Sequence, residues 1–385
     1  MNRLLIHHHA VAYVSPEGIW LQSFIATWVN SLAPYFERVG LLLHETSIKG
    51  GKHDTLIPFK HVKLESLGPE GRTWDRLQRI ARIKEKCSSV SSQYDGLLIR
   101  GITPRGYTVF KHTSIRSKFF LLVGSLIDSQ PRFEFKRIYP YLMYFVRKEE
   151  LKKIGAQSIC LSNSKKVATE FSDFVKKKVY FTPTSSISNR DILPFCPKGF
   201  DSPEINLLFC GRITFDKGVF ELFKAVKPLG EKLSRKIKLT MIGSVDNETK
   251  TRLIEVAQKD DFEERVNWLG FVPYGKELLD QFSFADFCVL PSYHEGFPHT
   301  IWEAGICSVP MVVTNVGGIP GMVSENEVSF IKPKSIDSIV EVISQLVSNP
   351  SLSKNKTKAL YNLATQYTLE KNAKALFEIL MSKKN

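Results

Sequence analysis

The sequence predicts an α/β protein made of two domains, each with a parallel sheet. Short apolar runs alternate along the chain with segments of helical periodicity, a pattern typical of parallel strands joined by covering helices. A length of 385 residues suits two domains, each with its own hydrophobic core. Between them, residues 185–204 mix Ser, Asn, Pro and Gly without periodicity, as linkers do. We therefore expect an N-terminal domain over residues 1–190 and a C-terminal domain over residues 200–365.

Apolar runs in the first half predict six strands, and helical periodicity predicts two helices among them. Helical spacing of apolar side chains predicts a helix over residues 19–38. The same spacing predicts a second, strongly basic helix over residues 73–87. The expected strands are residues 4–6, 39–44, 94–100, 119–123, 158–161 and 179–181.

The second half repeats this alternation. Helices are expected from about residue 219 and over residues 247–258, and an amphipathic segment closes the chain at residues 368–383. The expected strands are residues 205–209, 237–241, 266–268, 287–290 and 311–313.

Two glutamates, Glu295 and Glu303, bracket a Gly-Phe-Pro turn that follows the apolar run 287–290. Pro298 suits the first position of a helix, because the N–H that proline lacks would be unpaired there anyway. Glu295 then lies in the loop before the helix, and Glu303 lies about a turn and a half inside it. The free amides of the helix start lie between the two carboxylates, at the positive end of the helix dipole. This arrangement can bind a molecule with hydroxyl groups at both ends and phosphates in the middle, such as a sugar nucleotide.

A glycine and two cations follow the apolar run 205–209. Gly211 lets the backbone turn tightly beside a phosphate, Arg212 offers a planar fork to phosphate oxygens, and Lys217 adds a point charge. Ligands of open α/β sheets bind outside the carboxyl ends of the strands, so these residues and the two glutamates are expected at one site. The alternative is that the cations are ordinary surface residues and that the glutamates are a turn acid and a partly buried acid.

The order and spacing of these segments resemble the motifs of retaining glycosyltransferases of family 4, which have the GT-B fold. The two glutamates resemble the family's E-x7-E motif, and the glycine with its two cations resembles its phosphate clamp. Together the motifs span about residues 205–335, whereas the N-terminal half resembles the family only loosely. The residues that carry the resemblance are 209–212 with Lys217, 239–243, 266–272, 295–303 and 314–320.

The resemblance implies a GT-B architecture, in which two Rossmann-like domains face each other across a cleft. Residues 366–385 would form a helix that packs back onto the N-terminal domain. Glu295, Arg212 and Lys217 are implied as the catalytic residues, with Glu295 at the sugar hydroxyls. The other expected donor-binding residues are Glu303 at the ribose hydroxyls, Gly211, Gly243, Phe271, Val272, Gly296, Phe297, Pro298, His299, Thr300 and, in the first domain, Gly18.

The implied reaction moves a sugar, with retention, from a nucleoside diphosphate sugar to a glycan or lipid-linked acceptor in the synthesis of cell-surface polysaccharide or lipopolysaccharide. Arg212, Lys217 and the helix amides would neutralise the leaving diphosphate, so neither a metal ion nor another cofactor is expected. Many family members also place a histidine after a mid-domain strand. The comparable stretch, residues 123–128, has none, and Asp128 or the backbone of residues 124–125 would take its place.

The net charge of +14 belongs to the first half of the chain. Residues 1–200 hold 31 Lys/Arg and 16 Asp/Glu, whereas residues 201–385 hold 22 and 23. This excess is either a solvated basic face or a surface that binds anionic lipid headgroups. Nucleic acid is not an expected partner, since no zinc-finger, ribonucleoprotein or helix-turn-helix signature accompanies the charge. The helix 73–87 favours lipid, because its basic side chains flank an apolar face; they are Arg76, Arg79, Arg82, Lys84 and Lys86.

Other sequence features indicate a cytoplasmic protein attached peripherally to the inner face of the membrane. No stretch of eighteen apolar residues predicts a membrane span, and the start of the sequence lacks the apolar region of a signal peptide. Six scattered cysteines form no C-x-x-C pair. Side chains alternate along a strand, so His7, His8 and His9 cannot all converge on one metal ion.

Two other classes of function compete with sugar transfer. An epimerase of sugar nucleotides or a phosphorylase would share the two-domain fold. Phosphorylases, however, are far longer and need pyridoxal phosphate, and epimerases lack the paired-glutamate turn in this form. A non-catalytic protein that binds membranes or nucleic acid through its basic half would leave the motifs of the second half unexplained.

Overall fold

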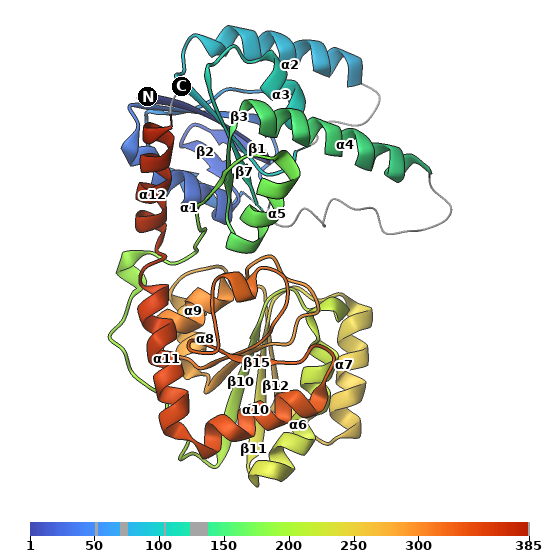
Figure 1. Ribbon diagram of the computed structural model, residues 1–385. Helices are drawn as coiled ribbons and strands as arrows, with labels where there is room; N and C mark the ends of the chain where they lie inside the picture. The colour runs from blue at the N-terminus through green and yellow to red at the C-terminus, as the bar shows by residue number, and fades with distance from the viewer. Residues whose placement is uncertain (51–52, 70–75, 104, 124–137, 384–385) are drawn as a thin grey trace. The chain divides into compact units, whose positions relative to one another are not determined.

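Two compact units make up the chain in the computed structural model, which describes all residues except 51–52, 70–75, 104, 124–137 and 384–385 (Figure 1). The first unit comprises residues 1–184 and 369–385, and the second comprises residues 185–368. Each unit is built on a sheet of mainly or wholly parallel strands with helices on both faces. The predicted α/β fold class is therefore confirmed.

The sheet of the first unit has nine strands arranged around β1 (Arg3–Ser15). Strand β1 pairs in parallel with β3 on one side and with β6 on the other, and its far end turns back into the antiparallel strand β2. The parallel strands follow the order β5-β3-β1-β6-β7-β8-β9. Strand order therefore reverses between β1 and β6, which makes this position the switch point of the sheet. The other strands are β2 (Gly18–Leu21), β3 (Arg38–Thr46), β4 (Thr55–Ile57), β5 (Val62–Leu64), β6 (Gly96–Arg100), β7 (Ser117–Leu122), β8 (Ile159–Ser162) and β9 (Val179–Phe181).

Two separate apolar layers cover the faces of this sheet. On one face, α1 and α12 lie side by side (Figure 1), and the ring of Phe377 in α12 stacks on Tyr35 at 5.1 Å. On the other face, Ile83, Ile154 and Phe171 come from three further helices and are buried against the strands. The helices are α1 (Ser23–Leu32), the 3-10 turn η1 (Ala33–Tyr35), α2 (Arg76–Ser91), α3 (Gly106–His112), α4 (Ile138–Gln157), α5 (Lys165–Val175) and α12 (Leu369–Ser382).

The first unit differs from the sequence-based expectation near its start. The expected helix 19–38 is wrong at both ends, because Ile19 and Trp20 belong to β2 and pair with β1 and β4, and the helix proper ends at Leu32. The first strand does not end at the histidines either. It continues to Ser15 after a change of register between His7 and Val11.

The sheet of the second unit has six strands, all parallel, in the order β12-β11-β10-β13-β14-β15. This order is that of the doubly wound nucleotide-binding sheet, and its switch point lies between β10 and β13. All five strands expected from the sequence are present, and β15 is an additional one. The strands are β10 (Glu204–Cys210), β11 (Lys236–Ile242), β12 (Val266–Gly270), β13 (Phe287–Leu290), β14 (Met311–Thr314) and β15 (Ser329–Ile331).

Helices cover both faces of the second sheet, with α6 and α7 on one side and α8 and α9 on the other (Figure 1). The rings of Phe223, Phe282 and Trp302 come from these helices and are fully buried. None of the helices in the described part of the chain is long and apolar enough to cross a membrane. The helices are α6 (Val219–Leu233), α7 (Asn247–Lys259), α8 (Lys276–Phe284), α9 (Thr300–Ile306), α10 (Ile336–Ser348) and α11 (Pro350–Ala364), with 3-10 turns η4 (Asn189–Asp191), η5 (Phe215–Lys217), η6 (Glu263–Arg265) and η7 (Ile319–Gly321).

Candidate active site

The candidate site lies at the carboxyl ends of β10 and β13, on either side of the switch point of the second sheet. Strand β10 ends at Cys210, directly before the predicted clamp, and β13 ends at Leu290, directly before the loop that contains Glu295. Thr300 joins the two segments, because its hydroxyl donates to the Cys210 carbonyl at 3.2 Å. The fold thus brings together motifs that are about 80 residues apart in the sequence.

Backbone hydrogen bonds from glycines connect the ends of adjacent strands in this unit. The Gly211 amide donates to the Ile242 carbonyl at 2.9 Å, and the Gly243 amide donates to the Gly270 carbonyl at 2.7 Å. A Cβ atom on Gly243 would lie 1.8 Å from the Gly211 carbonyl oxygen, and Gly243 has a φ of +138°. Only glycine therefore fits at Gly243, where the turns after β10 and β11 pack backbone against backbone.

Lys217 and Glu295 form an ion pair at the centre of the site. Lys217 Nζ lies 2.7 Å from Glu295 Oε1, and the two side chains are only 14% and 11% exposed. The Ser292 hydroxyl donates to the same carboxylate oxygen at 2.7 Å. The pair joins the turn after β10 to the loop after β13, so two of the predicted catalytic residues are in direct contact.

The loop between Pro291 and Glu295 is held against η5 and α6. The Tyr293 amide donates to the Asp216 carbonyl at 2.8 Å, and the Tyr293 hydroxyl donates to Glu221 at 2.7 Å. Gly218, with φ +68°, leaves no room for a side chain, because a Cβ there would lie 2.1 Å from the Pro291 carbonyl oxygen. These contacts fix the direction from which Glu295 enters the site.

The turn after β14 supports the same loop from the other side. The Thr314 hydroxyl donates to the Ser292 carbonyl at 2.6 Å, and the Gly318 amide donates to the Gly296 carbonyl at 2.8 Å. Gly317 has a φ of +58°, and a Cβ there would lie 1.7 Å from the Glu295 carbonyl oxygen. The glycine turn expected to shape the site therefore packs directly on the backbone of Glu295.

Helix α9 begins later than the sequence suggests. It spans Thr300–Ile306 with His299 as its N-cap, so Pro298 is not its first residue and Glu303 lies in its first turn. The carbonyls of Pro298 and His299 accept the first backbone hydrogen bonds of the turn, from Ile301 and Trp302. Pro298 and His299 therefore precede the helix and accept its first hydrogen bonds, and neither belongs to it.

Glu303 is buried beneath the site. It is 6% exposed, and its Oε1 accepts a hydrogen bond from the Ser186 hydroxyl at 2.7 Å. Burial raises the pKa of this carboxyl from 4.5 to about 7, and the hydrogen bond from Ser186 only partly opposes the shift. An accepted hydrogen bond favours the charged form of a carboxyl group, so any further donor to Glu303 would lower its pKa again.

The raised pKa of Glu303 predicts a pH-dependent stability. Between pH 4.5 and about 7 the folded state holds a proton on Glu303 that the unfolded state has lost. The free energy of unfolding should therefore fall as pH rises through this window, by up to about 1.4 kcal/mol per pH unit. Urea unfolding at pH 5, 6 and 7 should show this slope in the wild type and a smaller slope in Glu303→Gln. Equal slopes in the two proteins would show that Glu303 titrates normally.

The remaining predicted residues lie around this core. Arg212 is exposed and, within the described residues, makes no ion pair or hydrogen bond, so its guanidinium is available to a ligand. Phe271 is 71% exposed just beyond the end of β12, and Val272 is half-buried beside it. Phe297 packs on Trp302 at 4.8 Å. Gly18 lies in the first unit, where it begins β2 in a hairpin with Ser15.

Several residues of the site had no signal in the sequence. Ser186 lies in the stretch expected to be a linker, yet it is the hydrogen-bond donor to Glu303. Ser292 and the Tyr293–Glu221 pair support Glu295. Residues 124–128, proposed to replace the family's mid-domain histidine, lie outside the described residues. No group of three or more potential metal ligands occurs within the described residues.

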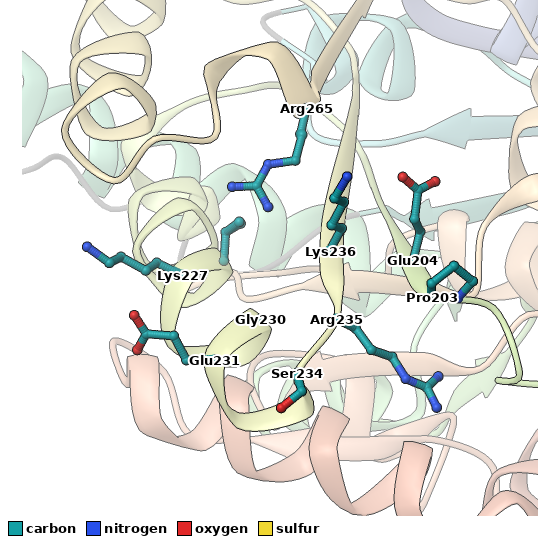
Figure 2. A pocket seen from close by; sticks show the side chains of 10 residues that line it. Pro203, Glu204, Lys227, Gly230, Glu231, Ser234, Arg235, Lys236 and Arg265 are labelled. Atoms are coloured by element: carbon teal, nitrogen blue, oxygen red, sulfur yellow. The ribbon is translucent and has the colours of Figure 1, made fainter.

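A separate hollow of about 590 Å³ lies at the opposite, amino-terminal ends of β10 and β11 (Figure 2). Its lining includes Lys227, Arg235, Lys236 and Glu204. Lys227 pairs with Asp260 and Glu204 pairs with Lys238 on exposed surface, so two of these four charges already have partners. Ligands of parallel sheets bind at the carboxyl ends of strands, and this hollow is therefore not the candidate active site.

The two-unit architecture is that of the GT-B glycosyltransferases. Sucrose-phosphate synthase from Thermosynechococcus elongatus has a TM-score of 0.70 and 16% identity, with 99% of both chains covered. The Anabaena protein HepE, solved in complex with UDP, has a TM-score of 0.73 and 15% identity, with 99% of this chain and all of that chain covered. At these identities the likeness shows the fold.

The sequence of the second unit is more informative. Residues 196–367 match the family described as "Glycosyl transferases group 1", and this segment contains every predicted site residue except Gly18. A putative teichuronic acid biosynthesis glycosyltransferase of Bacillus subtilis is 32% identical over 170 residues, or 44% of this chain and 40% of that protein. A 2-deoxystreptamine N-acetyl-D-glucosaminyltransferase of Niallia circulans is 26% identical over 150 residues, or 39% of this chain and 38% of that protein. The matched segment thus spans less than half the length of these relatives.

Proposed function

We propose that this chain is a retaining glycosyltransferase of the family 4 type. It transfers a sugar, as a hexosyltransferase, from a nucleoside diphosphate sugar to a glycan or lipid-linked acceptor in cell-surface polysaccharide or lipopolysaccharide synthesis. The observation that carries the proposal is the pair Lys217–Glu295 at the switch point of the second sheet, with Arg212, unpaired among the described residues, on the adjoining strand end. The match of this segment to group 1 glycosyl transferases, and the UDP bound to a structural neighbour, support the same site.

Each of these side chains has its own role in the proposed reaction. Arg212 binds the diphosphate through its guanidinium, and Lys217, now held by Glu295, turns toward the charge that develops on the leaving phosphate. Glu295 then accepts hydrogen bonds from the hydroxyl groups of the transferred sugar. Glu303 accepts hydrogen bonds from the ribose hydroxyls in place of Ser186. Retention follows if the departing phosphate accepts the proton of the attacking hydroxyl, a route that needs no protein nucleophile.

The test is product analysis with a panel of nucleotide sugars and candidate acceptors. A transferase releases nucleoside diphosphate and glycosylates the acceptor, whereas an epimerase yields an isomerised nucleotide sugar. Arg212→Ala should abolish nucleotide release, and Arg252→Ala, an exposed arginine on α7, should not. Isomerisation without transfer, or full activity of Arg212→Ala, would overturn the proposal.

Transfer is expected not to depend on a divalent metal ion. Two cations at the strand ends already provide the charge that a bound metal supplies to a diphosphate in other enzymes. Initial rates with and without excess EDTA should agree within about twofold, a barrier change of less than about 0.5 kcal/mol. A strict requirement for added Mg²⁺ or Mn²⁺ would show that the phosphate partners are misassigned.

We further propose that the protein works in the cytoplasm, attached peripherally to the inner face of the membrane through its basic first unit. The described part of helix α2 qualifies the sequence-based expectation, since Lys86 pairs with the buried Glu65 at 2.8 Å and is not available to lipid. The apolar side chains of Ile83 and Cys87 on this helix do not face lipid, because both are buried in the core of the first unit. Attachment therefore rests on charge, from side chains such as Arg82 and Lys84, which remain exposed. Trp74 is outside the described residues, as are the side chains of Arg76 and Arg79.

Vesicle co-sedimentation tests this attachment. The intact protein should bind anionic vesicles at low salt and release them at high salt, because basic side chains near a charged membrane each contribute about 1 kcal/mol. The double variant Arg82→Glu, Lys84→Glu should bind less, whereas Lys259→Glu in the nearly neutral second unit should not change binding. Equal binding to neutral and anionic vesicles would show that the basic face is only solvated and does not bind lipid headgroups.

A further inference from the structure

A buried arginine lies at the switch point of the first sheet. Arg100 ends β6, is 6% exposed and is the register partner of His8 in β1. Its Nη1 lies 3.1 Å from His8 Nε2. Within the part of the chain that the structure describes, its Nε–H has no hydrogen-bond acceptor and no carboxylate pairs with the guanidinium. Burial alone lowers its pKa to about 10, so it remains charged at neutral pH.

His8 adds a second buried hydrogen-bond donor beside Arg100. A guanidinium has only donors, so Arg100 donates to His8 Nε2, and the proton of the neutral imidazole is then on Nδ1. This Nδ1 is buried and has no partner within the described residues. Burial and the neighbouring Arg100 charge hold the pKa of His8 at about 3, which keeps the ring neutral.

The first turn of α1 borders these two side chains and adds no negative charge. The turn contains no acidic residue, and its N-cap, Gln22, makes no side-chain capping hydrogen bond. The Arg100 guanidinium lies 5.0 Å from the ring of Trp28 and 5.8 Å from the ring of Phe24. Phe24 is 49% exposed, so the guanidinium is bounded on this side by a ring at the protein surface. The positive end of the helix dipole and the arginine thus favour an anion at the same place.

A buried charge is costly to a fold unless a counter-charge or hydrogen bonds compensate it. A guanidinium is compensated best by the two oxygens of a phosphate or carboxylate, which match its fork. Carboxyl ends of strands at a switch point are also where such sheets bind ligands. We propose that Arg100, with His8 and the first turn of α1, binds an oxyanion group, a phosphate or a carboxylate, of the acceptor. The identity of the ligand as the acceptor rests on the proposed function, whereas the oxyanion site itself does not.

Thermal unfolding of the full chain with inorganic phosphate tests the site without any transfer assay. The background variant is Arg212→Ala, Lys217→Ala, which removes the phosphate-binding cations of the second unit. Chloride at equal ionic strength serves as the salt control. Phosphate should raise the Tm of this background, and adding Arg100→Met should weaken phosphate binding at least about tenfold, as expected for a lost charge-assisted pair. Adding Arg116→Met, an exposed arginine of the same unit, should leave binding unchanged.

Two results separate a ligand site from a structural arginine. If the buried guanidinium is compensated only when an anion is bound, it does not stabilise the free protein. Arg100→Met should then have a Tm without phosphate that is equal to or higher than that of its parent. A lower Tm together with an unchanged phosphate response would overturn the proposal, because Arg100 would then serve only to pack on Trp28.

Steady-state kinetics of the single variant Arg100→Met then identify which oxyanion group Arg100 binds. Arg100→Met should raise KM about tenfold for an acceptor that carries the recognised group and leave the donor KM within about twofold. Comparing phosphate-bearing, uronate-bearing and neutral acceptors distinguishes the two anions. A raised donor KM, or an equal effect on neutral acceptors, would overturn the acceptor assignment. Phosphate binding in a chain that transfers no sugar would refute the proposed function and leave the oxyanion site standing.

Discussion

Replacing Glu295 by alanine should lower kcat at least about a hundredfold, equivalent to about 2.7 kcal/mol of lost transition-state stabilisation. Its carboxylate is held by Lys217 and Ser292, each at 2.7 Å, so it is oriented before the donor binds, and Ser292 can hold it after Lys217 turns to the phosphate. The substitution removes the acceptor for the sugar hydroxyls and also frees Lys217 to take other positions. Initial rates at saturating donor measure the loss.

Two matched variants make this result specific. Glu295→Gln retains a side-chain oxygen for Ser292 but not the charge opposite Lys217, so it should be folded and still strongly impaired. His294→Ala changes the neighbouring side chain in the same loop. It should leave kcat within about twofold, because the proposed mechanism gives the His294 side chain no role. Near-normal turnover of a folded Glu295→Ala protein would remove Glu295 from the reaction.

The sequence predicts the second unit well because its information is local. Strands β10, β13 and β14 are short runs rich in buried apolar residues, although β12 is largely exposed, and the motifs follow directly where the runs of β10 and β13 end. The switch-point rule then places Gly211 and Glu295 at one site without knowledge of any side-chain contact. Gly243 and Gly317 are visible in the sequence as turn glycines, but the need for glycine there comes from backbone far away in the chain, since a Cβ would meet Gly211 and Glu295.

The parts that sequence reasoning missed depend on contacts between distant segments. Ile19 and Trp20 have helical spacing with the residues that follow, but pairing with β1 and β4 makes them a strand. Ser186 reaches Glu303 across more than a hundred residues, and nothing in its own neighbourhood predicts that role. In the sequence, Arg100 is simply the last residue of a predicted strand. Its lack of an acidic partner among the described residues becomes visible only when β1, β6 and α1 are placed together.

Replacing Gly317 by alanine should destabilise the second unit by several kcal/mol, or displace Glu295 and abolish transfer. The left-handed φ of +58° alone costs a non-glycine residue about 1 kcal/mol. The steric clash costs more, because the new Cβ would lie 1.7 Å from the Glu295 carbonyl oxygen and neither backbone can yield without moving the loop. Losses of this size for one methyl group are exceptional and indicate a specific clash.

Gly270→Ala is the matched control for this substitution. Gly270 has a similar φ of +67°, but a Cβ there meets no atom within 4 Å. It should therefore cost only the backbone strain, about 1 kcal/mol. Urea unfolding of the two variants beside the wild type separates strain from clash, and initial transfer rates report whether the site still forms. If the two variants lose the same stability and both retain full transfer, the turn at Gly317 does not position Glu295.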